Sequence, residues 1–162
     1  SFKPNIKQDI LFRFACGIYG QSPFYKELRD ENGNLHSDVL SQKSLHFVFS
    51  SDWNFQMLER PFKLMASAYY KYLWDINPYY LDNVQLRYMA ENNAIGYARG
   101  IDVRLFGEMI KGIDSWLSFS LMNTEEDIQG DGKGYIPRPT DRLYDISISF
   151  QDYIPNVPFI RA

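Results

Sequence analysis

Apolar and polar residues alternate along most of this chain, and the alternation predicts β-strands. A period of two places successive side chains on opposite faces of a strand, whereas a helix repeats its apolar positions every three or four residues. Every even-numbered residue in 62–76 is apolar or aromatic, whereas Lys63, Ser67, Lys71 and Asp75 lie between them. Six segments follow the rule: 10–19, 45–55, 62–76, 101–109, 117–121 and 144–150.

The connections between these segments alternate in length. Short turns containing Pro or Gly are expected at 57–61, 111–114 and 154–158, since these residues suit tight turns. Long polar loops are expected at 20–42, 78–94 and 127–142. Brief periplasmic turns and longer extracellular loops are typical of outer-membrane β-barrels.

Strand length and orientation support the same interpretation. Several segments exceed the ~5–6 residues usual in soluble domains and match the about 9–11 residues that cross a bilayer when tilted. We expect residues 1–5 near the periplasm and an outward strand from Asp9. The chain then makes three hairpins and the stub of a seventh strand at 159–162.

Aromatic residues are expected to form two girdles, one near each membrane surface. Those near the expected periplasmic ends are Trp53, Phe55, Phe62, Trp116 and Tyr153, and those near the outer ends are Tyr19, Tyr72, Trp74 and Tyr144. Trp116 and Tyr153 lie beside turns, so the pattern allows them either face.

Composition and charge argue against a nucleic-acid-binding protein and are compatible with a barrel. The 162 residues carry a net charge of −3, too mild to indicate a nucleic-acid partner. Aromatic residues reach 17%, and a mean hydropathy of −0.36 is compatible with a barrel because polar lumen-facing residues offset the lipid-facing ones. Cys16 is the single cysteine, expected as a small apolar residue, and no disulfide is expected within the chain.

The sequence predicts no enzyme, no cofactor and no metal site. It contains no nucleophile-elbow, zinc-protease or phosphate-loop motif. His36 is expected in a loop and His46 on a lumen face, both in simple polar roles. The acidic run 124–127 (TEED) does not fit the spacing of a calcium loop, and we expect it in a solvated loop.

Loop residues that combine rings with a hydrogen-bond donor are candidates for ligand contact. Such groups grip ligands at a barrel mouth, although they equally suit packing of loop on loop. The candidates are Phe24, Tyr25, Tyr79, Tyr80, Tyr135 and Arg138. Three glycines inside an expected strand, Gly96, Gly100 and Gly107, are interpreted as architectural, because glycine permits bends and close backbone approach.

Five segments resemble parts of TonB-dependent outer-membrane receptors. The overall sequence pattern is most similar to that of the receptors of Bacteroidetes bacteria. Residues 17–23 (GIYGQSP) resemble the family's Gly-x-Tyr-x-Gln-x-Pro segment before a long outer loop. The others, in order, are 68–71 (AYYK), 96–102 (GYARGID), 115–120 (SWLSFS) and 139–142 (PTDR). Their order along the chain, with turns in register, carries the resemblance from about Asp9 onward.

The resemblance implies active import across the outer membrane. The family has a 22-stranded barrel in outer-membrane lipid, filled by an N-terminal plug, and takes up iron chelates, vitamin B12, glycans or peptides with energy from the TonB complex. A surface lipoprotein is a further possible partner. Residues 1–162 are expected to be a partial barrel domain, without the plug, the TonB-binding segment and the remaining strands, because six strands are fewer than the about eight of the smallest single-chain barrels.

Two alternatives remain at this point. One is a fragment of a passive porin-like or adhesin barrel, which a plug domain upstream would argue against. The other is a soluble β-rich binding domain, which alternation fits equally well and which would fold as a monomer without detergent.

Overall fold

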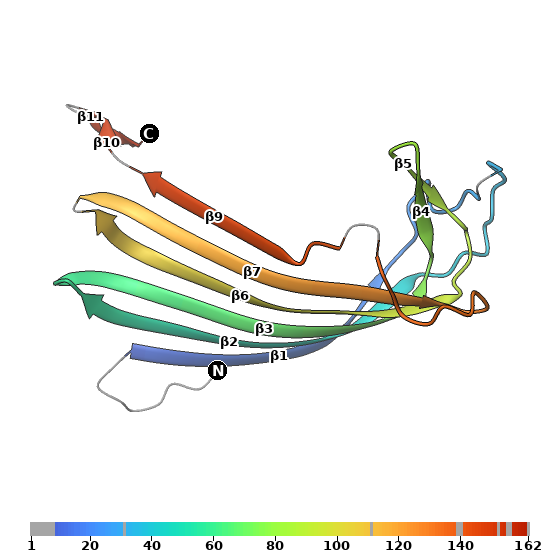
Figure 1. Ribbon diagram of the computed structural model, residues 1–162, viewed down its shortest axis with the longest axis horizontal. Helices are drawn as coiled ribbons and strands as arrows, with labels where there is room; N and C mark the ends of the chain where they lie inside the picture. The colour runs from blue at the N-terminus through green and yellow to red at the C-terminus, as the bar shows by residue number, and fades with distance from the viewer. Residues whose placement is uncertain are drawn as a thin grey trace.

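Six long strands run up and down through one antiparallel sheet in the computed structural model (Figure 1). They are β1 (Asp9–Gln21), β2 (Gln42–Met57), β3 (Arg60–Ile76), β6 (Ala94–Ile110), β7 (Ile113–Ile128) and β9 (Tyr144–Gln151). They lie side by side in chain order, each paired with the next long strand. All six strands expected from the alternation are therefore confirmed, and most extend beyond the expected bounds.

The structure describes residues 9–30, 32–110, 112–138, 141–151, 153–154 and 157–161, with side chains as far as Gln151. Within these ranges the chain is all-β, and no helix is long and apolar enough to cross a membrane. The expectations for residues 1–5 and for Ala162 lie outside these ranges.

Five short strands complete the fold. β4 (Tyr79–Asp82) and β5 (Gln85–Tyr88) make a hairpin within the second long loop, and β8 (Ile136–Pro137) pairs with β7 in the third. β10 (Tyr153–Ile154) pairs with β11 (Val157–Arg161). The expected seventh strand is thus present in a small hairpin, separate from the large sheet.

The register sorts side chains into two contrasting faces. One row across the six long strands, termed here part of the apolar face, contains Phe14, Phe49, Ala68, Ile101, Leu121 and Tyr144. The next row, on the opposite or polar face, contains Arg13, Ser50, Ser67, Asp102, Ser120 and Asp145. Because side chains alternate with a period of two, a constant register keeps each face distinct across the strands. Among the described residues of the long strands, the register shifts only near strand ends, between Leu73 and Ile76 in β3 and between Gly107 and Ile110 in β6.

The apolar face is uncovered in this structure. Its side chains that rank as exposed large hydrophobic residues are Phe14, Ile18, Phe47, Phe49, Tyr70, Tyr72, Ile101, Phe119, Leu121, Tyr144, Ile146, Ile148 and Phe150. Single exposed apolar residues are ordinary on a protein surface, but a contiguous patch marks a surface that meets a partner, a ligand or a membrane.

The polar face is held by ion pairs. Arg13 and Lys63 contact the two carboxylate oxygens of Asp52 at 2.5 and 3.2 Å. The Asp52 side chain is only 10% exposed, so both cations offset the cost of burying its charge. His46, expected on this face, lies there and hydrogen-bonds Ser44 over 2.8 Å.

Tight turns join the strands at the end away from the long loops. Leu58 and Glu59 connect β2 to β3, and both have a positive φ, of 55° and 61°. That pair of conformations is typical of a two-residue hairpin turn whose twist matches the strands. Gly112, with φ 82°, precedes β7 at the same end. The short turn expected at 57–61 is confirmed, and so is the one at 111–114 over the described residues 112–114. The turn expected at 154–158 includes residues that lie outside the described ranges.

The glycines of β6 permit close approach of neighbours. A Cβ on Gly100 would lie 2.5 Å from the carbonyl oxygen of Leu121 and from the hydroxyl of Tyr69. A Cβ on Gly96 would lie 2.7 Å from the carbonyl oxygen of Glu125. Both distances are far below van der Waals contact, which confirms the architectural interpretation of these residues.

Two expectations need correction. The run 124–127 lies in β7 rather than in a solvated loop, and Glu126 is 1% exposed, because β7 continues beyond the apolar face to Ile128. Tyr19 lies at the expected height but on the polar face, where its ring contacts that of His46 with centroids 4.4 Å apart and the ring planes tilted by 32°.

Position along the strand and parity decide which face each of the other aromatic residues lies on. Trp53, Phe55 and Phe62 line the apolar face at the turn end, whereas Trp116 shares the parity of the polar face. Tyr144 begins β9 but pairs with Leu121, well short of Ile128 where β7 ends. The side chain of Tyr153 lies outside the described part of the chain.

Candidate functional site

The three long loops gather at one end of the sheet (Figure 1). The most deeply buried side chains of the described residues also lie there: Ile76, Asn77, Pro78, Ala94 and Glu126. The sheet itself has little core of its own, since its faces are open on both sides. The loop end is therefore where the fold has the rigidity that a binding site requires.

Arg138 connects the third loop to the sheet and to the second loop. Its guanidinium lies over the ring of Tyr79, 5.2 Å from the ring centroid. Its Nε is 3.0 Å from an oxygen of the Glu126 carboxylate, whose side chain is 2% exposed. These two buried atoms lack hydrogen-bond geometry, so the contact is an ion pair and not a hydrogen bond.

The buried surroundings change the protonation of this cluster. Burial raises the pKa of Glu126, and the neighbouring Arg138 opposes the rise. Burial also raises the pKa of Tyr88, helped by the negative charge of Glu27 and opposed by Arg138. The rings of Tyr79 and Tyr88 contact each other across the β4–β5 hairpin, with centroids 5.8 Å apart and the ring planes tilted by 55°.

Glu27 ties the first loop to the second. Its carboxylate accepts hydrogen bonds from the backbone N–H of Phe24 at 2.8 Å and from the side chain of Gln42 at 3.3 Å. Its carbonyl oxygen accepts a hydrogen bond from the Asn77 side chain at 2.9 Å. Glu27 and Asn77 are 5% and 1% exposed, so these bonds form in a dry environment where they are strong.

A hollow of about 810 Å³, termed here the loop pocket, lies between the first and second loops. Its polar lining residues are Asp30, Asn32, His36, Asp38, Glu91, Asn92 and Asn93, and its apolar ones are Val39, Leu40, Met89 and Ala90. The volume lies within the range of small-molecule sites, about 300–1,000 Å³.

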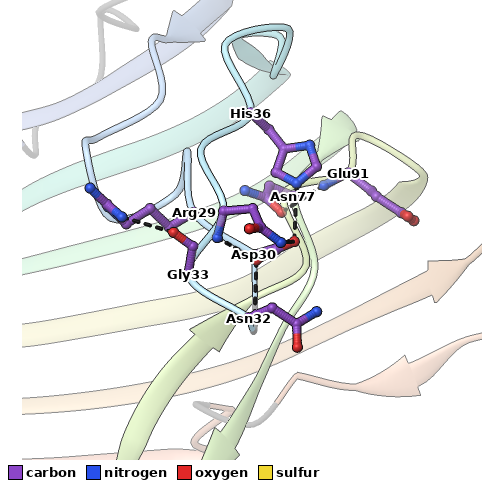
Figure 2. A network of polar contacts seen from close by, with 8 residues as sticks. Arg29, Asp30, Asn32, Gly33, His36, Asn77 and Glu91 are labelled. Carbon is purple, nitrogen blue, oxygen red and sulfur yellow. Dashed lines mark hydrogen bonds and ion pairs between the residues drawn. The ribbon is translucent and has the colours of Figure 1, made fainter.

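Asp30 organises the first-loop side of the pocket (Figure 2). One of its oxygens accepts hydrogen bonds from the backbone N–H groups of Asn32 and Asn34, and the other contacts the side chains of Asn34 and His36. The hydrogen bond from the Asn34 side chain is the largest cause of a pKa lowered to about 2. Asp30 is therefore ionised at any physiological pH.

Asn92 and Asn77 hold the second-loop side. The Asn92 side chain exchanges hydrogen bonds with the backbone of Leu40, at 2.6 and 3.1 Å, and donates to the carbonyl of Asp75 at 2.7 Å. The Asn77 side chain accepts from the backbone N–H of Glu91. Both walls of the loop pocket are thus cross-linked through side chains rather than through a sheet.

The structure divides the six residues expected to contact a ligand. Tyr79 and Arg138 stack together, with Tyr80 in the same strand as Tyr79. Phe24 and Tyr25 lie apart on the first loop, both 64% exposed, and Tyr25 accepts a hydrogen bond from Arg29. Tyr135 turns to the apolar face, where its ring packs on Tyr97 at 5.4 Å.

None of those six residues lines the loop pocket. The sequence does not single out the residues of this pocket, because Asp, Asn and Gly in 30–34 (DENGN) are equally typical of an ordinary turn. The run of polar residues 91–93 (ENN) is likewise typical of any polar loop. His36 occupies the loop expected of it, in a polar role beside Asp30.

The pocket has no metal-binding arrangement. Within the described ranges no three His, Cys, Asp or Glu residues come together as ligands. Its carboxylates and amides offer mainly hydrogen-bond acceptors and donors for a polar organic ligand.

Comparison with known proteins gives no relative. No family model, no curated protein and no solved structure matches this chain.

Proposed function

We propose that this chain is part of the barrel wall and outer loops of a TonB-dependent outer-membrane receptor, which binds a nutrient ligand and imports it with TonB-transduced energy. The observation that carries the proposal is the uncovered apolar face, which continues in register across all six long strands. Lipid is the environment in which such a face has low free energy, because apolar surface is removed from water.

The height of the apolar face fits a bilayer. On β3 the apolar and aromatic positions of this face run from Phe62 to Ile76. The part from Phe62 to Tyr70, where arginine and asparagine side chains enter the face, is 9 residues long (62 to 70 inclusive) and matches the about 9–11 that cross the hydrocarbon when tilted. In the row of Tyr70 the same face contains Arg99 and Asn123, and the next row contains Glu125. Those polar side chains suit the boundary between lipid and water.

The edges of the sheet support a larger barrel. Among the described strands, β1 pairs with β2 alone and β9 pairs with β7 alone, so each leaves one edge unpaired. An unpaired edge in lipid costs several kcal/mol for each backbone group. Further strands must therefore complete the barrel, as the resemblance to a 22-stranded family implies.

The long loops would form the ligand-binding end. The loop pocket is preorganised by the hydrogen bonds of Asp30, Asn77 and Asn92, and preorganisation lowers the entropy cost of binding. A ligand held there lies at the mouth of the conduit lined by the polar face. Phe24, Tyr25 and Tyr80 would then contact ligand only from the rim.

A fluorophore on the native Cys16 tests the membrane placement. Cys16 lies on the apolar face beside Phe47, and Ala15 lies on the polar face beside Val48. In bilayers of brominated phospholipid, we expect bimane on Cys16 to be strongly quenched. The matched variant carries Ala15→Cys with Cys16→Ala, moves the label by one residue, and should be quenched little.

Equal quenching of the two labels, or a full-length protein that folds without detergent, would argue for the soluble β-rich domain.

Active import is tested separately in cells, by abolishing the proton gradient. Uptake through a passive porin-like barrel would continue, whereas uptake through a TonB-dependent receptor would stop.

A further inference from the structure

A cluster of aromatic side chains crosses the upper margin of the apolar face. Tyr70 stacks on Tyr97 with centroids 6.2 Å apart, and Tyr97 contacts Tyr135 at 5.4 Å. Tyr72 stacks on Trp74 beside them at 6.0 Å. Tyr70, Tyr72 and Tyr135 are 43%, 37% and 47% exposed. We call these five residues the aromatic platform.

The platform is more than a ring of residues at the ends of strands. Tyr135 comes from the third loop, and the pairing of β8 with β7 brings it down against the wall of the sheet. Burial raises the pKa of Tyr135, and the nearby Tyr72 and Asp127 raise it further. Tyr135, which the sequence predicts in a loop at the barrel mouth, therefore lies against the apolar face.

Planar polar groups adjoin the rings. Arg99 lies over Tyr97 at 5.3 Å from the ring centroid and donates its Nε–H to the Asn123 amide oxygen at 3.2 Å. Glu125 accepts a hydrogen bond from the Tyr97 hydroxyl over 2.5 Å and from the Asn123 side chain over 3.3 Å. The row thus presents a guanidinium, an amide and a carboxylate beside exposed rings.

Arg99 keeps most of its binding capacity. Its guanidinium has five N–H groups, and among the described residues only the Nε–H has an acceptor, the Asn123 amide oxygen. The side chain is exposed. Such a guanidinium is suited to a phosphate oxygen, with which it forms paired, charge-assisted hydrogen bonds.

We propose that the aromatic platform, with Arg99, Asn123 and Glu125, binds the sugar-phosphate headgroup of a glycolipid in the outer leaflet. The rings offer flat apolar surfaces for the C–H faces of sugars, Glu125 and Asn123 accept bonds from sugar hydroxyls, and Arg99 meets a phosphate. This donor, acceptor and charge complementarity distinguishes a glycolipid from a plain phospholipid. The proposal rests on the lipid-facing placement of the apolar face.

The test compares two lipids on the full-length protein in phospholipid nanodiscs. The probes are a fluorescently labelled lipopolysaccharide with a short sugar core, and labelled phosphatidylglycerol, which is anionic but carries no sugar core. We expect the protein to bind the first at least about tenfold more tightly, a difference of about 1.4 kcal/mol.

Three variants remove separate parts of the platform. Tyr97→Leu, Tyr135→Ala and Arg99→Ala should each weaken glycolipid binding about three- to tenfold, as expected for the loss of a ring or a stacked cation. The control Phe14→Ala removes an exposed ring from the same face, away from the platform, and should leave binding unchanged.

Equal binding of the two lipids, or glycolipid binding unaffected by all three substitutions, would overturn the proposal. Loss on Arg99→Ala alone would also overturn it, because charge would then suffice without the rings. The Cys16 quenching experiment separates the two failures. If Cys16 is quenched and the lipids bind equally, only the platform is wrong, and if Cys16 is not quenched, both proposals fail.

Discussion

The ring of Phe62 fills the space directly above Gly107, its partner on the neighbouring strand. A Cβ added to Gly107 would lie 2.4 Å from the Cδ1 atom of Phe62. Phe62 itself is only 4% exposed, although it lies on the open face of the sheet. The ring is thus covered by Gly107 on one neighbouring strand, and it stacks on Phe55 of the other with centroids 5.9 Å apart.

We predict that Gly107→Ala destabilises the protein by about 1–3 kcal/mol, the usual cost of overpacking. The measurement is the urea midpoint of the full-length protein in detergent micelles, followed by tryptophan fluorescence. Gly20→Ala is the matched control, because a Cβ at Gly20 would have no neighbour within 4 Å. Equal losses at both positions would show that chain flexibility, and not the Phe62 contact, explains the effect.

A second prediction concerns the anchor of the third loop. Arg138→Ala leaves the Glu126 carboxylate buried without its cation, a change that costs about 3–5 kcal/mol in buried pairs. We expect the third loop to detach, so trypsin should cut at the exposed Lys133 far faster than in the unmodified protein.

Arg87→Ala serves as the control for that experiment. Arg87 and Asp82 are 3.6 Å apart, with side chains 43% and 52% exposed, and exposed pairs contribute at most about 1 kcal/mol. Cleavage at Lys133 should therefore be unchanged. The importance assigned to the Glu126 contact would be wrong if both arginine variants were cut at the same rate.

The turn between β2 and β3 should be open to stabilisation. A non-glycine residue in the left-handed region costs roughly 1–2 kcal/mol, and both Leu58 and Glu59 are in it. Leu58→Asn with Glu59→Gly supplies the residues that this turn type prefers, so we predict a gain of about 1–2 kcal/mol in unfolding free energy.

Leu58 is 75% exposed, so the gain should not come from losing its apolar side chain. Leu58→Ala tests that point, because alanine removes the side chain and keeps the unfavourable backbone conformation. We expect no gain from Leu58→Ala in the same urea titration. An equal rise in both variants would refute the conformational explanation.

The first-loop wall of the loop pocket should depend on pH. The folded pKa of Asp30 is about 2, below the ordinary 3.8, so folding favours the ionised carboxylate. Its stabilisation is complete above about pH 4 and is lost as the pH falls through about 2. The loop should therefore loosen in acid across that window.

A spin label on Ser37→Cys, in a Cys16→Ala background, reports the mobility of this loop. We expect mobility to rise between pH 4 and 2, the window set by the Asp30 shift. Asp30→Asn should give higher mobility that is independent of pH across the same window. A label whose mobility is constant in the unmodified loop would contradict the assigned role of Asp30.

Much of the sheet can be predicted from local sequence. The alternation in 62–76 specifies both a strand and its two faces, because parity along a strand is fixed by backbone geometry. Turn residues such as Gly112 mark where neighbouring strands meet, and once a turn sets the register the same parity carries the faces across the pair. Strand ends were less exact, since pairing extended β7 to Ile128.

The loop end could not be predicted in the same way. Whether Tyr135 lies among the loops or against the apolar face depends on the two-residue pairing of β8 with β7, which no local pattern predicts. The burial of Glu126 depends on Arg138, a residue in a different segment of chain. The loop pocket joins residues from two loops that are separated by two complete strands.

By itself, the sequence determined the strands, their contrasting faces and the division into short turns and long loops, because these follow from periodicity and backbone conformation over a few residues. Only the tertiary structure decided which loop residues meet: Tyr79 with Arg138, Asp30 with His36, and Tyr135 with Tyr97. Those contacts depend on the path of each loop through space, which is fixed by hydrogen bonds and burial between segments far apart in the sequence.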